Sequence, residues 1–346
     1  MLFEKIKYKN LGFNKLTSSN KGKNTVLLAG SSGTIGSALL IELLKKKYDV
    51  VCPVRTLSDN ANKISATYPK AKIVLADISK SNCINFLISK HPEVDVVISC
   101  IGSRNGTYQE AVDVEYNANM NLLQIAENLN ASQFIMLSAI CVQKPVLQFH
   151  KYKLDFEEAL KKSNIKHTII RPTAFFKSLA GQIKRVKEGK SFIVFDNGTK
   201  NSFKPISESD LSKYIASKIL DASYYNKLLI VGGPGPAISP RYQGKILFKA
   251  AGRPEKFLSI PSVIFKILCI VISPLTIFSN RIRDFREFLK IALFYATESM
   301  LVWDSHTKSY RDGKTPEFGK DTLEEFYIKS VDSEFKKLDL ANKRLF

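Results

Sequence analysis

The chain has 346 residues, of which 45% are hydrophobic and 24% are charged, and its formal net charge is +20. These proportions are typical of a globular protein and exclude a disordered chain. The positive excess favours an acidic neighbour, such as a nucleotide or an anionic membrane surface; lysines spread over solvated faces are the alternative. The sequence contains no zinc finger, RNA-binding motif or basic helix that stands out, so we expect no nucleic-acid partner.

The cysteines and histidines do not indicate a metal site. The five cysteines form no C-x-x-C pair, and the four histidines are scattered along the chain. We therefore expect free thiols in a reducing compartment and no bound metal.

Residues 1–24 are expected to form a basic N-terminal tail. This segment is rich in lysine and lacks the apolar core of a secretory signal, whereas a transit peptide would contain more Ser and Arg. The alternatives are an additional N-terminal structural element and a weak contact with anionic lipid.

A glycine-rich loop follows an apolar run at residues 25–29. The loop consists of Gly30, Ser31, Ser32, Gly33, Thr34, Ile35 and Gly36, and an amphipathic helix is predicted after it over residues 37–44. Glycines at this spacing permit a tight turn and let the backbone approach a pyrophosphate, while the helix N-terminus presents free N–H groups and a positive dipole. We predict that these seven residues bind the diphosphate of a dinucleotide. An ordinary glycine-rich turn is the alternative.

Strands and helices alternate from residue 25 onward. After the first strand, apolar runs predict strands over residues 50–55, 72–77, 94–102, 133–138, 167–172 and 227–231. Helical patterns lie between them, most clearly over 116–129 and 154–162. Near-continuous apolar strands separated by helices are typical of a parallel sheet that is covered on both faces. We predict an α/β fold with a doubly wound parallel sheet over residues 25–240.

The pattern changes after residue 240, and we expect a mostly helical substrate-side region over 241–346. The apolar stretch at 257–278 is interrupted by Pro261 and Pro274, so it is too short to cross a bilayer. We expect a buried or interfacial helix there that lines a substrate cavity, with peripheral membrane contact as the alternative. Further helices are predicted over 281–300 and 322–337, the second capped by Asp321.

The ends of three predicted strands carry candidates for cofactor contacts. Arg55 ends the second strand, where an arginine suits a 2′-phosphate and so favours NADPH over NADH. Asp77 ends the third strand, where a side chain can meet the adenine edge. The turn at Cys100 and Gly102 lets the backbone pass beside the cofactor. A surface arginine, a strand-end cap and a turn glycine are the respective alternatives.

The segment from Ser138 to Lys153 resembles the catalytic region of short-chain dehydrogenases and reductases. That family has a serine at the end of this strand and a Tyr-x-x-x-Lys pair on the next helix. Ser138 and Lys153 match, whereas Phe149 stands where the tyrosine would be. The tyrosine gives a proton to a developing alkoxide, and the lysine binds the nicotinamide ribose. Ketone chemistry is therefore disfavoured, and Tyr152 points elsewhere on a helix.

The run after the sixth strand adds four candidates. Its turn at Pro172 and Thr173 is expected to pack against the nicotinamide. Phe175 and Phe176 are expected to stack on a flat apolar substrate. The alternative is that both rings belong to the core.

Longer motifs are similar to those of the divinyl chlorophyllide a 8-vinyl-reductases, which are atypical short-chain reductases of chlorophyll synthesis. The likeness is carried by residues 137–145, 171–178, 204–210, 231–235, 296–301 and 319–326. Together with the glycine loop these motifs span nearly all of the chain after residue 24. The phenylalanine before Lys153 also fits the pattern of this family.

The resemblance implies NADPH-dependent reduction of the 8-vinyl group of a chlorophyllide-type tetrapyrrole to ethyl. Hydride addition leaves negative charge that the conjugated macrocycle spreads, so water, Ser138 or Lys153 suffices as the proton source. The implied location is the cytoplasm or the plastid stroma, with peripheral contact to a photosynthetic membrane as a variant. Two other functions stay open: a non-catalytic NADPH-binding sensor or assembly protein, and a reductase of another conjugated alkene.

Overall fold

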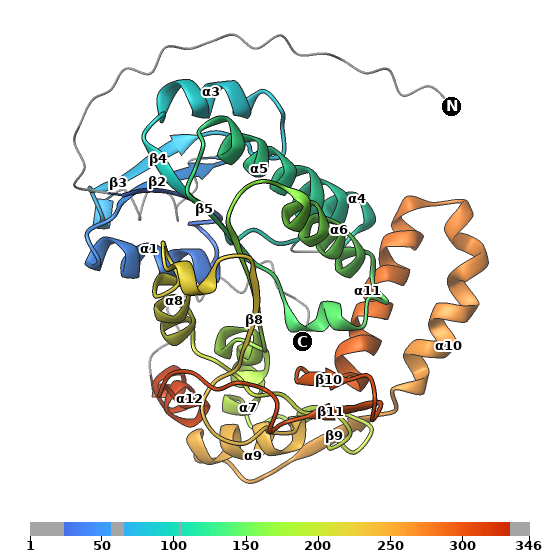
Figure 1. Ribbon diagram of the computed structural model, residues 1–346. Coiled ribbons are helices and arrows are strands. Elements are labelled where there is room, and N and C mark those ends of the chain that lie inside the picture. The colour runs from blue at the N-terminus through green and yellow to red at the C-terminus, as the bar shows by residue number, and fades with distance from the viewer. Residues whose placement is uncertain (1–23, 57–65, 104–105, 333–346) are drawn as a thin grey trace.

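A seven-stranded parallel sheet forms the centre of the computed structural model, which describes residues 24–56, 66–103 and 106–332 (Figure 1). The strand order is β3-β2-β1-β4-β5-β6-β8. The strands are β1 (Thr25–Ala29), β2 (Asp49–Val54), β3 (Ala71–Leu75), β4 (Val94–Ser99), β5 (Gln133–Leu137), β6 (His167–Pro172) and β8 (Lys227–Val231). Every pair is parallel. The predicted doubly wound sheet is confirmed, and each of its strands overlaps a predicted one.

Helices cover both faces of this sheet (Figure 1). On one face, leucines and isoleucines of α1 (Thr34–Lys45) and α8 (Glu208–Ala216) pack on the strands. On the other face the covering helices are α3 (Cys83–Lys90), α5 (Ala118–Asn128) and α6 (Gln148–Lys162). Because both faces are buried, the strands need apolar residues on both sides, which explains their continuous apolar runs.

The helix predicted over 116–129 is the end of a longer helical segment. It begins with α4 (Tyr108–Glu110) and continues through a π-helical stretch, Ala111–Asn117, into α5. Such a π-helical stretch is often found at a functional site.

The second half of the chain adds a smaller layer with its own core. Strand β7 (Phe192–Phe195) pairs in parallel with β9 (Phe257–Ile260), and β10 (Val302–Asp304) pairs antiparallel with β11 (Ser309–Arg311). The helices of this layer are α7 (Ile183–Lys187), α9 (Pro240–Ala250) and α12 (Leu323–Asp332). Strands β9, β10 and β11 were not recognised in the sequence, because strands of three or four residues give too little alternation. β7 and β9 come from the two sides of residue 240.

The end of this layer differs from the prediction in one further detail. The cap expected at Asp321 is wrong, since the N–H of Glu325 donates to Oγ1 of Thr322 at 3.3 Å. Asp321 instead accepts a hydrogen bond from the hydroxyl of Ser207, which caps α8.

The apolar stretch at 257–278 contains β9, helix α10 (Val263–Ile272) and a 3₁₀ turn over Ser273–Ile277. Helix α10 packs along α11 (Asn280–Thr297) at the outer edge of the molecule (Figure 1). The expectation of a buried helix is wrong, because no residue of α10 is buried. None of the helices in the described ranges is both long and apolar enough to span a bilayer.

Candidate functional site: the carboxyl edge of the sheet

The glycine loop between β1 and α1 has a shape that only small residues allow. Gly30 has φ +86°, and a Cβ built on it would lie 2.7 Å from the carbonyl oxygen of Cys100. A Cβ on Gly36 would lie 2.1 Å from the carbonyl oxygen of Gly30. Gly33 caps α1 without a side-chain hydrogen bond, so the first N–H groups of the helix stay available to a ligand. These residues fit the diphosphate of a dinucleotide.

The loop lies where the order of the strands reverses. β1 has β2 on one side and β4 on the other, and ligands of doubly wound sheets bind outside the carboxyl ends of the strands at such a point. The N–H of Cys100 donates to the carbonyl of Ala29 at 2.9 Å, so the turn after β4 borders the loop. Burial raises the pKa of the Cys100 thiol to about 12, which keeps it protonated.

Arg55 and Asp77 lie at the ends of β2 and β3, as predicted. Arg55 is exposed, directly after β2, and the next segment of chain, 57–65, lies outside the described residues. One carboxylate oxygen of Asp77 accepts from the N–H and the hydroxyl of Ser79, at 3.0 and 2.7 Å. This turn favours a structural role for Asp77, while its contact with adenine stays a prediction.

Lys153 forms a buried ion pair that the sequence analysis did not foresee. Its Nζ lies 2.6 Å from Oε2 of Glu115, and the side chains are only 7% and 2% exposed. Oε1 of Glu115 accepts from the N–H and the hydroxyl of Ser103, at 2.8 and 2.9 Å. Glu115 belongs to the π-helical stretch, where its side chain faces inward. No sequence signal marks this position, since it precedes the helix predicted from residue 116.

The position of the missing tyrosine is filled by packed rings. Phe149 stacks edge-on against His150, whose ring in turn meets Phe294 on α11. Tyr152 donates its hydroxyl proton to the hydroxyl of Tyr108 at 2.9 Å on the exposed side of α6. Tyr152 therefore points away from Lys153, as predicted.

A phenol reaches the neighbourhood of Lys153 from another helix. Tyr295 on α11 interacts with the thiol of Cys141, and the charges of Lys153 and Glu115 act on that thiol. Burial of its hydroxyl raises the pKa of Tyr295 well above its usual value, although 39% of the residue's surface is exposed. Tyr295 could not be recognised from the sequence because it lies far along the chain from the catalytic motif. We call Ser103, Glu115, Cys141, Lys153 and Tyr295 the Lys153 cluster.

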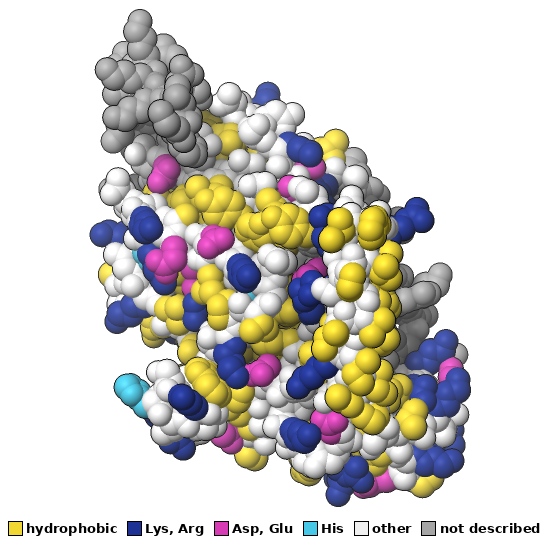
Figure 2. Space-filling view, turned by 90° about the vertical axis from the view of Figure 1, so that its right-hand side faces the viewer, with side chains coloured by type: hydrophobic (Ala, Val, Ile, Leu, Met, Phe, Trp, Pro, Cys, Tyr) yellow, Lys and Arg dark blue, Asp and Glu magenta, His cyan; other side chains and the backbone are white. Residues whose placement is uncertain are grey.

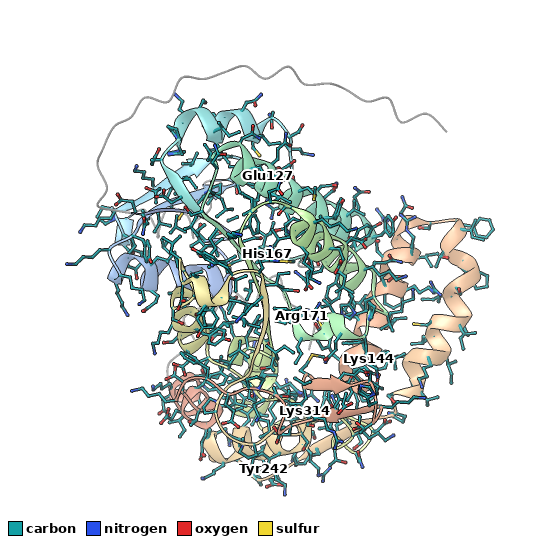
Figure 3. All side chains as sticks on the ribbon, in the orientation of Figure 1. Glu127, Lys144, His167, Arg171, Tyr242 and Lys314 are labelled. Carbon is teal, nitrogen blue, oxygen red and sulfur yellow. The ribbon has the colours of Figure 1, made fainter. Side chains whose placement is uncertain are left out.

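Ser138 lies at the end of β5, but its hydroxyl donates a hydrogen bond to another residue of the protein. Its hydroxyl donates to Oε1 of Glu157 on α6, at 2.5 Å. The guanidinium of Arg171 binds both oxygens of the same carboxylate, at 3.0 and 2.5 Å, near the carboxyl end of β6 (Figure 3). For Ser138 to protonate a substrate, this hydrogen bond has to break.

The residues after β6 serve mainly to hold the fold. Thr173 donates its hydroxyl to the carbonyl of Lys204 and its N–H to the carbonyl of Val231. Pro172 pairs with Val231 within the sheet. The prediction that Phe176 contacts the substrate is wrong, because the residue is 2% exposed and packs against Phe326 in the core of the second layer. Phe175 is half-buried, and its contact with substrate stays a prediction.

The segment after β5 is tied to the second half of the chain. Gln143 donates to the carbonyl of Leu301 at 2.6 Å and accepts from the N–H of Trp303 at 2.8 Å. Lys144 pairs with Glu298 at 2.6 Å and lies over the ring of Trp303 (Figure 3). Residues beyond 240 therefore border the Lys153 cluster.

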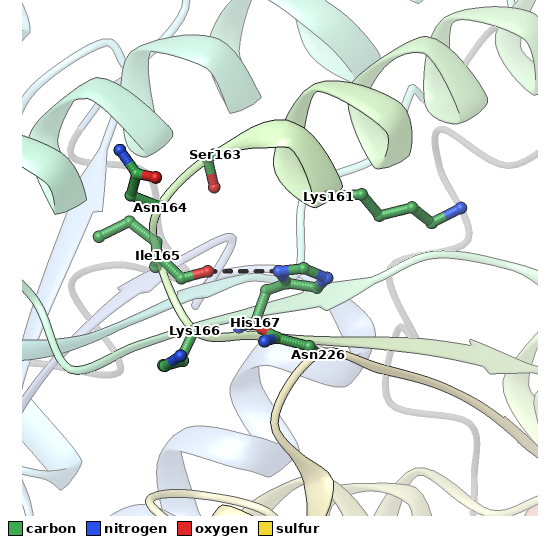
Figure 4. A pocket seen from close by; sticks show the side chains of 7 residues that line it. All are labelled: Lys161, Ser163, Asn164, Ile165, Lys166, His167 and Asn226. Atoms are coloured by element: carbon green, nitrogen blue, oxygen red, sulfur yellow. Dashed lines mark hydrogen bonds between the residues drawn. The ribbon is translucent and has the colours of Figure 1, made fainter.

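A cavity of about 400 Å³ lies at the opposite edge of the sheet (Figure 4). It is lined by Lys161, Ser163, Asn164, Ile165, Lys166, His167 and Asn226. His167 begins β6, whereas the glycine loop and Lys153 lie beyond the other ends of the strands. This cavity is therefore separate from the dinucleotide site.

Comparison with known proteins identifies the family. A family model described as NAD(P)H-binding matches residues 30–221. The chloroplastic divinyl chlorophyllide a 8-vinyl-reductase of Zea mays is 37% identical over 334 residues, which cover 94% of this chain and 83% of that protein. That of Arabidopsis thaliana is 38% identical over 318 residues, with coverage of 88% and 76%. This chain belongs to the divinyl chlorophyllide a 8-vinyl-reductase family. The resemblance seen in the sequence is confirmed, and the cofactor is a nicotinamide dinucleotide.

A solved structure supports the fold alone. The NADPH-dependent quinone oxidoreductase of Escherichia coli, in complex with NADPH, matches with a TM-score of 0.63 and 16% identity. The match covers 88% of this chain and 98% of that one. The chain thus has the Rossmann-like fold of nicotinamide-dependent enzymes.

Several motifs of the 8-vinyl-reductase resemblance join the two layers of the molecule. The ammonium of Lys204 pairs with Asp312 and Glu317, at 2.7 and 2.8 Å. The carboxylate of Asp210 accepts from two successive N–H groups, those of Lys320 and Asp321. These motifs fix the second layer against the sheet.

Proposed function

We propose that this protein reduces the 8-vinyl group of divinyl chlorophyllide a to an ethyl group, with NADPH as the reductant. The observation that carries this proposal is identity of 37–38% to reductases of that name over about nine-tenths of the chain. The glycine loop supports it, since its geometry fits a dinucleotide diphosphate. Family membership favours this function over a non-catalytic sensor or a reductase of another alkene.

The missing tyrosine is consistent with this chemistry. NADPH, when bound, supplies a hydride, which forms a C–H bond at one vinyl carbon. The former π electron pair then takes a proton at the other carbon, so that C=C becomes CH–CH. Negative charge in this step spreads over the macrocycle, whereas a ketone would concentrate it on one oxygen. A weaker proton donor therefore suffices, and Phe149 is tolerated.

Different residues of this chain are assigned to different parts of the cofactor. Gly30, Gly33 and Gly36 let the diphosphate approach the N-terminus of α1. Arg55 supplies a fork of donors for the 2′-phosphate, which favours NADPH over NADH. Lys153, held in place by Glu115 at 2.6 Å, is assigned to the nicotinamide ribose.

Tyr295 is the proton donor in this proposal. Ser138 directs its proton to Glu157, and Lys153 is engaged by Glu115. The raised pKa of Tyr295 means that the phenol keeps its proton at neutral pH, next to Cys141. The phenolate left after transfer regains a proton before the next turnover.

The substrate and the location follow from the same proposal. A chlorophyllide carries a carboxylate, and the positive charge of this chain favours its capture. The relatives are named as chloroplastic proteins. We place this protein in the plastid, in peripheral contact with a photosynthetic membrane.

Incubation of the purified protein with NADPH and divinyl chlorophyllide a tests the function. Vinyl reduction shortens the conjugation, so the Soret band should shift to the blue while NADPH absorbance decreases. A protein that binds NADPH tightly but leaves the Soret band in place would be a sensor or an assembly protein. NADPH consumption with another conjugated alkene and none with the pigment would indicate a different substrate.

A further inference from the structure

Many of the exposed large hydrophobic side chains of the described residues lie on helix α10 and the turn after it. We call this the α10 surface, and its most exposed side chains are Val263, Ile267, Ile270, Val271, Ile277 and Phe278. Ile277 and Phe278 are 85% and 83% exposed at the tip between α10 and α11. Figure 2 shows the apolar side chains of this region as a continuous column along one edge of the molecule. Monomeric proteins rarely leave such a surface uncovered.

The chain segment that carries the α10 surface has charges of one sign. Between Glu255 and Asp284 the chain carries only basic charged residues, namely Lys256, Lys266, Arg281 and Arg283. Lys266 lies on α10, and the two arginines follow the apolar tip, all three of them exposed. An apolar surface with a basic border matches the interface of an anionic bilayer, where apolar side chains enter and basic ones meet phosphate groups.

The shape of the surface favours a bilayer over a protein partner. A helix that packs on a protein needs one apolar stripe, but α10 is apolar on nearly all sides and none of its residues is buried. α10 has ten residues and so is too short to span the hydrocarbon core. A short helix with this composition suits a position in the plane of the membrane interface.

We propose that the α10 surface is the membrane-docking site of this protein, and that it binds the surface of an anionic lipid bilayer. This inference deepens the peripheral contact proposed above and does not depend on vinyl reduction. Ile277 and Phe278 enter the acyl region, while Lys266 and Arg281 remain at the level of the headgroups. Helix α11 connects this surface with Tyr295 in the Lys153 cluster.

Flotation with lipid vesicles, without pigment or NADPH, tests the proposal. The probes are vesicles of pure phosphatidylcholine and vesicles in which about one-quarter of the lipid is phosphatidylglycerol. We expect the protein to float with the anionic vesicles and to dissociate as salt is raised. The double variant Ile277→Ser/Phe278→Ser should bind at least ~10-fold more weakly, because two apolar side chains no longer enter the membrane. The charge variant Lys266→Glu/Arg281→Glu should lose the preference for anionic vesicles.

Two matched controls separate docking from general stickiness. Leu75→Ser/Val146→Ser removes apolar side chains that are also exposed, but lie elsewhere. Lys184→Glu/Lys329→Glu reverses two exposed charges on other helices. Both controls should bind vesicles like the unaltered protein, and circular dichroism checks that every variant is folded.

Three results would overturn the docking proposal. They are absence of vesicle binding, equal binding by the Ile277→Ser/Phe278→Ser variant, and a dimer of the unaltered protein that this variant converts to a monomer without any lipid binding. The last result would assign the surface to a second copy of the chain. Soret assays in detergent report the reductase activity separately, so vesicle binding without activity would refute only the proposed reaction.

Discussion

Variants of the Lys153–Glu115 pair can separate a role of Lys153 in cofactor binding from its role in stability. Lys153→Met leaves the Glu115 carboxylate buried with only the two donors of Ser103. Breaking a buried ion pair by removing one partner costs about 3–5 kcal/mol, because the remaining charge has no compensation. Lys153→Met/Glu115→Gln removes both charges, and the amide oxygen that replaces the carboxylate can still accept from Ser103. We expect this double variant to recover about 1–3 kcal/mol relative to Lys153→Met alone.

NADPH affinity should behave differently from stability in these variants. Loss of the lysine contact with the ribose costs about 1.5–3 kcal/mol, which corresponds to ~10–100-fold weaker binding. This loss should persist in the double variant, because neutralising Glu115 does not restore a donor. Urea unfolding followed by the fluorescence of Trp303, the one tryptophan of the chain, measures stability. Titration with NADPH measures affinity under folding conditions.

Lys204 offers a matched control for this experiment. It is a second buried lysine with two carboxylate partners, and its ion pairs join the two layers of the fold. Lys204→Met should lower stability by less than Lys153→Met, since Asp312 and Glu317 are about half exposed and become hydrated. Its NADPH affinity should not change. If the double variant at Lys153 and Glu115 bound NADPH normally, the pair would be purely structural and the assigned ribose contact would be refuted.

Three further predictions concern single residues. Arg55→Glu should weaken NADPH binding ~10–100-fold relative to NADH, because it replaces a phosphate-binding fork by a like charge; unchanged selectivity in a titration with both cofactors would remove Arg55 from the site. Tyr295→Phe should lower kcat ~100-fold with little change in NADPH affinity, because a positioned proton donor is lost. Tyr152→Phe, which removes a phenol that bonds only Tyr108, is its control, and an unchanged kcat for Tyr295→Phe would assign the proton to water. Burial, followed by the charge of Lys153, lowers the pKa of His150 to about 4, so the buried ring has to stay neutral. Stability should therefore be complete above about pH 6.5 and fall by about 3 kcal/mol as pH drops to about 4, whereas His150→Leu should lack this part of the loss in urea titrations across pH.

The sequence predicted the sheet well because its strands are buried on both faces. Runs such as Thr25–Ala29 and Val94–Ser99 are mostly apolar, and helices separate them regularly. The glycine loop was equally readable, since Gly30 and Gly36 occupy places where a Cβ would collide with backbone. Strands and tight turns of this kind depend on residues that are close together in the sequence, so they can be predicted from it.

Contacts between distant segments could not be predicted in the same way. Glu115 reaches Lys153 because a π-helical stretch turns it inward, and Tyr295 reaches Cys141 because α11 folds back over the segment after β5. Composition also could not tell an apolar core residue from an exposed one. Phe176 was expected at the substrate and lies in the core, whereas α10 was expected to be buried or interfacial and has no buried residue.

Helix α11 acts as a spacer of fixed length between the docked end of the molecule and the reacting carbon atoms. From Arg281 to Tyr295 the helix rises about 21 Å, at 1.5 Å per residue. Because α11 packs along α10, which lies in the plane of the membrane interface in this proposal, this rise runs along the membrane surface, and a long ester chain on a pigment ring at Tyr295 would extend into the lipid. Free-acid and esterified pigments would thus differ in how firmly they remain tethered to the bilayer during turnover.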